Sequence, residues 1–356
     1  MARPYVSVLI DTYNHERFIE QAVSSVLEQD FPAADREILV VDDGSQDRTP
    51  EIVARFAPQV RLIRKANGGQ ASAFNAGIPE CQGEIVAFLD GDDWWASGKL
   101  KQIVTAFSDN PGVGLIGHGF TEVFNDGSQR NEMLRDSFRF RIDSGAGARL
   151  FRLRKAFLGT SRMAYRTDIL RRIGPVPESL TIQADEFLFT VGALFSETLI
   201  LRDPLTFYRL HGQNLFQVSD GSVTALRRKH AVLLALVESL RHRFAEEQVP
   251  GEASEAVIEA VQTEADALQL SLDGGTPLDT IRIELRTYRI DHENISWLRW
   301  ILKSLSLFPA LFFPPKRYWE WKQKMASNSL YRKARQTLIP DPHHPHIEVT
   351  GDRSRR

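Results

Sequence analysis

The sequence has only one cysteine, Cys81, among its 356 residues, so no intrachain disulfide can form and a reducing compartment is expected. Charge of one sign is not in excess, because 44 Lys and Arg oppose 46 Asp and Glu for a net charge of −2. That balance argues against a globally basic nucleic-acid-binding protein. The first apolar run, residues 5–10, is too short for an export signal. No GxGxxG motif follows the first apolar run, which disfavours a dinucleotide fold, and the sequence has no GxxxxGK(S/T) motif of a P-loop.

Hydrophobic residues make up 42% and charged residues 25%, as in globular proteins. Nearly continuous apolar runs predict buried strands at 6–10, 37–41, 60–63, 84–89 and 113–116. Helical spacing between these runs predicts helices that include 49–56, 70–78 and 100–107. This alternation predicts an α/β fold with a mostly parallel central sheet flanked by helices.

Beyond residue 120 the pattern is mixed, and we expect an antiparallel excursion and further helix before a strand at 205–210. Two long helices are predicted at 223–247 and 252–272. The expected organisation is an α/β domain, a helical extension, a basic amphipathic segment and a disordered tail, at 1–218, 219–290, 291–340 and 341–356.

Acidic clusters directly follow two of the predicted strands, where ligands bind in such sheets. Asp90, Asp92 and Asp93 form the first cluster, whose oxygen ligands suit Mg²⁺ or Mn²⁺ together with a phosphate. The alternative for this cluster is a solvated acidic turn or a helix cap. Trp94 and Trp95 come next and form either the wall of a sugar or acceptor site or part of an aromatic core.

The second cluster is Asp42-Asp43-Gly44-Ser45-x-Asp47, which is also compatible with a tight turn and a helix cap. In the functional interpretation, Asp42 accepts hydrogen bonds from a nucleobase or ribose. A third motif, Asn67-Gly68-Gly69-Gln70, contains glycines that let the backbone approach a ligand closely.

In their order along the chain, these motifs resemble those of the family 2 glycosyltransferases, which have the GT-A fold. The motifs are Val-Ser-Val-Leu-Ile-Asp-Thr-Tyr-Asn, Val-Asp-Asp-Gly-Ser-x-Asp, Asn-Gly-Gly and Phe-Leu-Asp-Gly-Asp-Asp. The resemblance covers roughly residues 5–215. It implies a metal-dependent, inverting hexosyltransferase that moves a sugar from a nucleotide-diphospho sugar, expected to be UDP-linked, to a hydroxyl acceptor.

The resemblance also implies a donor pocket. In it, Asp42 would hold the base of the nucleotide, with Asp11 and Tyr13 lining the same pocket and Asn67 beside the nucleotide. The family usually has Pro or Thr where Asp11 stands, so this chain carries an additional carboxylate there.

Metal binding is implied for the Asp-x-Asp pair. Asp90 and Asp92 would handle the ribose and a Mn²⁺ or Mg²⁺ ion, with Asp92 the direct ligand and Asp93 an extension of the cluster. His211, in a Tyr-Arg-x-His stretch, would reach the metal or the diphosphate, although a lone histidine is as often structural.

A catalytic carboxylate is implied about ninety residues after the metal pair. The candidates here are Asp185 and Glu186, in the order Asp-Glu instead of the family's usual Glu-Asp. We favour Asp185 as the base that deprotonates the acceptor hydroxyl. Without the resemblance, an N-cap role for Asp185 would be the preferred interpretation.

The segment 295–335 combines nine basic residues and one acidic residue with many Trp, Phe and Leu side chains. Because Arg299 and Lys303 interrupt it, an amphipathic helix on an anionic membrane surface is expected instead of a spanning helix. This predicts a cytoplasmic protein on the inner face of the membrane, with a lipid-linked or surface-polysaccharide acceptor. The alternative is a helix packed on the catalytic domain.

Two functions other than glycosyl transfer are compatible with parts of this sequence. A sugar-nucleotide pyrophosphorylase would have a glycine-rich, basic loop after the first strand, where this chain has Asp11-Thr12-Tyr13-Asn14. A non-catalytic scaffold that binds nucleotide sugars is the second, and turnover of any donor would distinguish an enzyme from it.

Overall fold

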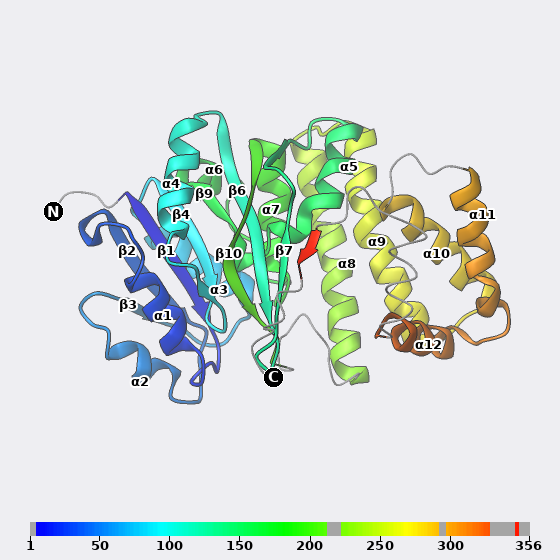
Figure 1. Ribbon diagram of the computed structural model, residues 1–356, viewed down its shortest axis with the longest axis horizontal. Helices are drawn as coiled ribbons and strands as arrows, with labels where there is room; N and C mark the ends of the chain where they lie inside the picture. The colour runs from blue at the N-terminus through cyan, green and yellow to red at the C-terminus, as the bar shows by residue number, and fades with distance from the viewer. Residues whose placement is uncertain (1–4, 212–221, 292–296, 328–345, 349–356) are drawn as a thin grey trace, which may run out of the picture. The chain divides into compact units, whose positions relative to one another are not determined.

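The computed structural model describes residues 5–211, 222–291, 297–327 and 346–348 (Figure 1). The chain divides into two compact units, Met1–Ser219 with Pro345–Arg356, and Asp220–His344. Most of the tail predicted at 341–356, and residues 292–296 and 328–340 of the predicted basic segment, lie outside the described residues.

The first unit is built on a mixed, mostly parallel α/β sheet, as the sequence predicts, and each of the six predicted strands is found. Its strands are β1 (Val6–Thr12), β2 (Arg36–Asp42), β3 (Arg61–Arg64), β4 (Ile85–Asp90), β5 (Trp94–Trp95), β6 (Val113–Val123), β7 (Gln129–Met133), β8 (Phe138–Phe140), β9 (Ala164–Arg166), β10 (Glu197–Arg209) and β11 (His346–Glu348).

Parallel pairing joins β3, β2, β1 and β4, which form one half of the sheet in that order. Strand β9 runs antiparallel between β4 and β6, and β10 runs parallel to β6. The expected antiparallel excursion is the β6–β7 pair together with β8, which pairs with β10.

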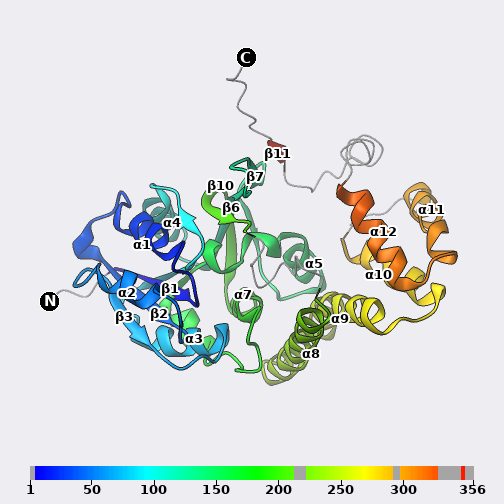
Figure 2. The same ribbon diagram turned by 90° about the horizontal axis from the view of Figure 1, so that it is seen from below.

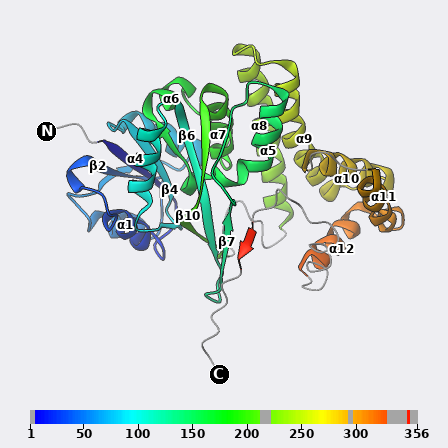
Figure 3. The same cartoon turned by 45° about the horizontal axis from the view of Figure 1, so that its top comes forward.

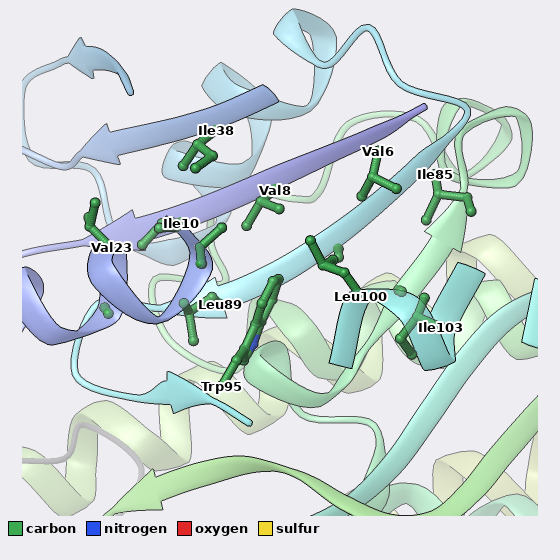
Figure 4. Close-up of a cluster of buried hydrophobic side chains, with 14 of the residues drawn as sticks. Val6, Val8, Ile10, Val23, Ile38, Ile85, Leu89, Trp95, Leu100 and Ile103 are labelled. Carbon is green, nitrogen blue, oxygen red and sulfur yellow. The ribbon is translucent and has the colours of Figure 1, made fainter. Parts of the chain in front are cut away.

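Helices cover both faces of this sheet (Figure 2). They are α1 (Ile19–Leu27), α2 (Thr49–Ala54), α3 (Gln70–Gly77), α4 (Lys99–Asp109), α5 (Gly145–Arg154), α6 (Thr167–Ile173) and α7 (Ala184–Phe195). Helices α1, α2 and α4 pack on one face, and α3 and α7 lie on the other. Figure 4 shows the core beneath the first face, where Val8 and Ile10 of β1 lie near Leu89 of β4 and Leu100 of α4.

The second unit is helical. It contains α8 (Val223–Glu246), α9 (Gly251–Asp273), α10 (Pro277–Asp291), α11 (Trp297–Ser306), the short 3₁₀ helix η5 (Phe308–Leu311) and α12 (Pro315–Ser327). Helices α8 and α9 match the two predicted long helices and run side by side (Figure 3). Among the described residues, every helix is too short or too polar to span a bilayer.

Candidate functional site

The site lies at the carboxyl edge of the parallel strands, where the fold leaves ligand-binding crevices. In the register of the sheet, Asp11 of β1 stands beside Asp90 of β4, and Thr12 of β1 stands beside Asp42 of β2. The acidic clusters predicted from the sequence therefore follow β2 and β4, the two strands that flank β1, at one edge of the sheet.

A tight turn after β4 presents Asp92 to two histidines. A Cβ at Gly91 would come within 2.5 Å of the Thr12 hydroxyl and 2.9 Å of His15 Nδ1, so this turn requires glycine. His211 Nε2 lies 2.9 Å from Asp92 Oδ2, and His15 Nε2 lies 3.9 Å from the same oxygen. The structure thus joins the two residues predicted to bind metal and adds His15, which the sequence analysis missed.

Electrostatics distinguish Asp92 from its neighbours. Burial by itself raises the pKa of Asp92, but His15 and the hydrogen bond and charge of His211 outweigh it, and the net shift is downward. Burial, followed by the charge of Asp92, raises the pKa of Asp11 well above its usual range. Burial and the charge of Asp11 do the same for Asp90. The surroundings therefore favour the ionised form of Asp92 over those of Asp11 and Asp90.

Asp42 lies fully buried at the end of β2. Its Oδ1 accepts a hydrogen bond from the Ser45 amide at 3.1 Å, and its Oδ2 lies 3.4 Å from Arg64 Nε. Tyr13, which is also predicted to line this pocket, is 36% exposed. The Ser45 contact is turn chemistry, and the Arg64 contact holds a cation beside the predicted base-binding carboxylate.

Asp43 organises the Asn67-Gly68-Gly69 loop, a role that the sequence analysis did not assign. Its carboxylate accepts hydrogen bonds from the amides of Gly68 at 3.0 Å and Gly69 at 2.7 Å, and from Lys65 Nζ at 2.6 Å. Asn67 Nδ2 donates to the Asp43 carbonyl at 3.1 Å. The two adjacent acids therefore have different roles. Asp43 fixes the loop that carries Asn67, and Asp42 is the predicted base-binding carboxylate.

Asp185 lies in the first turn of α7 and faces the acidic cluster. Its Oδ2 accepts hydrogen bonds from the Thr160 amide at 3.1 Å and the Thr160 hydroxyl at 3.2 Å, and its Oδ1 accepts one from the Glu186 amide at 2.9 Å. The charge of Asp185 contributes to the raised pKa values of Asp11 and Asp90. Helix α7 thereby brings this carboxylate to the strand edge.

Glu186 has different partners, although it is the next residue. Its Oε1 pairs with Lys155 Nζ at 2.6 Å, and Gln183 Nε2 lies 3.4 Å from its Oε2. The side chain is buried, with 7% of the residue exposed. Glu186 therefore forms an ion pair with Lys155, whereas the charge of Asp185 acts on Asp11 and Asp90 of the acidic cluster.

Arg209 of β10 secures the turn after β4. Its amide donates to Asp93 Oδ1 at 2.9 Å and its Nε donates to the Asp92 carbonyl at 2.8 Å. Its guanidinium lies 4.5 Å from the ring centre of Trp94, which stacks on Phe207. Burial and the charge of Asp92 raise the pKa of Asp93 to about 7. Asp93 is thus held inside the turn.

Comparison with known proteins identifies the family. Residues 7–174 match the sequence model described as Glycosyl transferase family 2. An uncharacterized glycosyltransferase of Nostoc is 34% identical over 219 residues, or 59% of this chain. That alignment covers 66% of the Nostoc protein, just under two thirds of its length.

The chain belongs to glycosyl transferase family 2. Solved structures show the same fold for this glycosyltransferase. A mannosyltransferase of Pyrobaculum calidifontis, in complex with GDP-Man and Mn²⁺, has a TM-score of 0.52 at 20% identity, covering 96% of this chain and 88% of its own. TarS 1–349 of S. aureus with UDP-GlcNAc has a TM-score of 0.52 at 19% identity, covering 81% and 89%.

The chemistry of Asp92 and His211, the two residues predicted to bind metal, fits a divalent cation that phosphate oxygens also hold. In the described part of the chain, no group of three or more His, Cys, Asp or Glu side chains is placed to hold a metal ion. Asp92 and His211 instead converge as one carboxylate and one imidazole. Mg²⁺ is commonly bound by one or two carboxylates together with substrate phosphates, and Mn²⁺ accepts both oxygen and imidazole ligands.

A buried lysine, Lys99, donates hydrogen bonds to residues next to the acidic cluster, among them Ser161, whose hydroxyl donates to Asp90. Lys99, the first residue of α4, is fully buried, and its Nζ donates to the Ser161 carbonyl at 2.6 Å and the Thr206 hydroxyl at 3.2 Å. It also lies 4.0 Å from the ring centre of Trp95, which is 3% exposed and belongs to the core. Burial lowers the pKa of Lys99 well below its usual range.

Lys99→Ala should lower the free energy of unfolding by about 3 kcal/mol, because it removes two buried hydrogen bonds and opens a cavity. Lys101→Ala, in the same helix, is the matched control. It removes an exposed ion pair with Asp30, 3.1 Å long, and should cost under about 1 kcal/mol. Urea unfolding of both variants measures the difference, and equal losses would contradict this role for Lys99.

Proposed function

We propose that this glycosyltransferase moves a sugar from a UDP-linked donor to a hydroxyl acceptor, with inversion at the anomeric carbon. The observation that carries the proposal is the convergence of Asp185 with Asp11, Asp90 and the Asp92–His211 pair at one strand edge. The complexes of the neighbouring structures with UDP-GlcNAc and GDP-Man support a nucleotide-sugar donor. The family match favours transfer over the pyrophosphorylase alternative.

The donor would lie across the carboxyl edge. Asp42 holds the base, with Tyr13 and Asn67 beside the nucleotide and Asp11 in the same pocket. Asp42 is buried next to Arg64, and a hydrogen bond to the Asp43 carbonyl holds Asn67. Both side chains are therefore held in place before the nucleotide binds.

Asp90 would handle the ribose, Asp92 with His211 would hold Mn²⁺ or Mg²⁺, and Asp93 extends this acidic cluster in the donor pocket. The bound cation supplies positive charge that offsets the charge of the departing diphosphate.

Asp185 takes the proton of the acceptor hydroxyl as the hydroxyl oxygen attacks the anomeric carbon. The bond from that carbon to the diphosphate oxygen breaks in the same displacement, and the nucleoside diphosphate leaves with the electron pair. Thr160 orients Asp185 through two hydrogen bonds. The acceptor is proposed to be a glycan or a lipid-linked glycan.

A thermal-shift panel of UDP, GDP, CDP, ADP and dTDP, with and without Mn²⁺, tests the donor site. A nucleotide at a hundred times its Kd adds about 2.7 kcal/mol of stability. We expect the largest stabilisation from UDP, and we expect it to require Mn²⁺. A larger Mn²⁺-dependent shift with GDP would change the base but keep the function, whereas no shift with any nucleotide would contradict the proposed donor site.

A further inference from the structure

Exposed apolar side chains are concentrated on α11 and η5. Eleven large apolar side chains are exposed in the described residues, and six of these lie between Trp297 and Phe312, with 45% to 73% of each exposed. We call these six residues the outer apolar face: Trp297, Ile301, Leu305, Phe308, Leu311 and Phe312. Contiguous apolar surface of this kind marks sites that bind a protein or a membrane.

Helical geometry makes this face continuous. Trp297, Ile301 and Leu305 are spaced by four residues, so they lie one above another on the same side of α11. In the segment that directly follows α11 in the chain, the exposed rings of Phe308 and Phe312 pack with their centres 5.0 Å apart. The result is a short apolar ridge.

The opposite side of α11 already packs within the second unit. The ring of Trp300 contacts Tyr288 of α10 edge-on at 5.6 Å, and Lys303 Nζ donates to Glu284 of α10 at 2.7 Å. Just beyond α11, Leu307 is buried with Tyr318. Helix α10 lies between α9 and α11 (Figure 1), and Trp297, Ile301 and Leu305 of α11 face outward.

Cations lie beside the outer apolar face in the chain. Lys316 and Arg317, in the first turn of α12, are exposed and form no ion pair with any described residue. They follow Phe313 by three and four residues. Lys303 and Lys322, by contrast, both pair with Glu284. The positive charge available to an external partner is thus smaller than the residue count suggests. Lys316 and Arg317 contribute to it, and they follow Phe312 and Phe313 closely in the chain.

We propose that the outer apolar face inserts into the headgroup region of an anionic lipid bilayer. Trp, Phe and Leu are the side chains that enter this region from a surface-bound helix, and neighbouring Lys and Arg bind anionic headgroups. A symmetric pairing with a second copy would place the same patch on both sides, so Lys316 and Arg317 of both copies would add like charges to one interface. The lipid surface avoids that repulsion. This inference goes beyond the proposed function, because membrane binding requires no turnover.

Flotation of the full-length chain with phosphatidylcholine vesicles, with and without phosphatidylglycerol, tests the proposal. We expect binding to the anionic vesicles and at least a tenfold loss of it in the triple variant Leu305→Glu, Phe308→Ser, Phe312→Ser. These side chains are exposed, so the fold is retained, and far-UV circular dichroism checks this. The matched control Leu234→Ser, Leu278→Ser removes two similarly exposed leucines of the second unit and should bind like the unmodified chain.

A charge variant tests the choice of lipid. In Lys316→Gln, Arg317→Gln, binding to the phosphatidylglycerol vesicles should fall roughly tenfold, since each cation near an anionic surface contributes to attraction. The proposal is overturned if the unmodified chain floats with neither vesicle, or if the triple variant binds as well as its control. It is also overturned if ultracentrifugation shows a dimer that the triple variant abolishes while vesicle binding is absent.

Discussion

Asp185→Asn should lower kcat for sugar transfer by about 1,000-fold, because the amide cannot accept the proton that a general base removes. The substitution keeps the size of the side chain. Its amide oxygen can still accept the hydrogen bond that the Thr160 amide donates at 3.1 Å, so the local structure should persist. Donor affinity should change little, since Asp185 is proposed to act on the acceptor.

Two measurements separate catalysis from binding in this variant. Initial rates with saturating donor give kcat, and isothermal titration with the nucleotide gives Kd. Glu186→Gln is the matched control, because it changes the adjacent carboxylate, which pairs with Lys155. It should lose some stability but keep kcat within about tenfold. An active Asp185→Asn protein beside an inactive Glu186→Gln protein would assign the base to Glu186 instead.

The fold and the position of the site could be predicted from the sequence because both depend on local patterns. Continuous apolar runs such as 37–41 and 84–89 mark buried parallel strands, and the acids that follow them necessarily meet at one edge. Helix ranges were predicted within a few residues for the same reason. Short strands such as β8 (Phe138–Phe140) and β9 (Ala164–Arg166) carry too few residues to show a period.

The residues that support the site could not be predicted, because their partners are distant in sequence. Lys99 donates to Thr206, 107 residues away, and Arg209 donates to Asp92, 117 residues away. His15 lies in an exposed-looking polar stretch and reaches Asp92 only through the fold. Asp43 gave a partial signal, since a turn alone does not need two adjacent acids.

In the second unit the sequence overstated the free positive charge. Counting residues 295–335 gives an excess of eight, but a count cannot show which cations have partners within the fold. Two of them, Lys303 and Lys322, lie against Glu284, which comes from α10 and is only 1% exposed. This buried carboxylate links α10, α11 and α12, and it holds Lys303 against α10 while Ile301 and Leu305 stay exposed.

Glu284→Gln should therefore lower the free energy of unfolding of the second unit by about 3 kcal/mol, because two lysines lose a buried counter-charge. The matched control is Glu264→Gln, which breaks a 3.0 Å pair with Lys229 between α9 and α8. That carboxylate is 37% exposed, so its loss should cost under about 1 kcal/mol. Urea unfolding followed by circular dichroism compares the two variants.

The pH dependence of stability identifies the charge of Glu284 as the cause. Burial alone raises the pKa of this carboxyl, but Lys303 and Lys322 outweigh it and hold the folded pKa below the ordinary value of 4.5. A lowered folded pKa stabilises the protein above pH 4.5, and the stabilisation is lost as the pH falls through the folded pKa. The stability gap between the unmodified chain and Glu284→Gln should thus be full at pH 7 and should shrink below pH 4.5. A gap that stays constant down to pH 3 would attribute the loss to packing instead of charge.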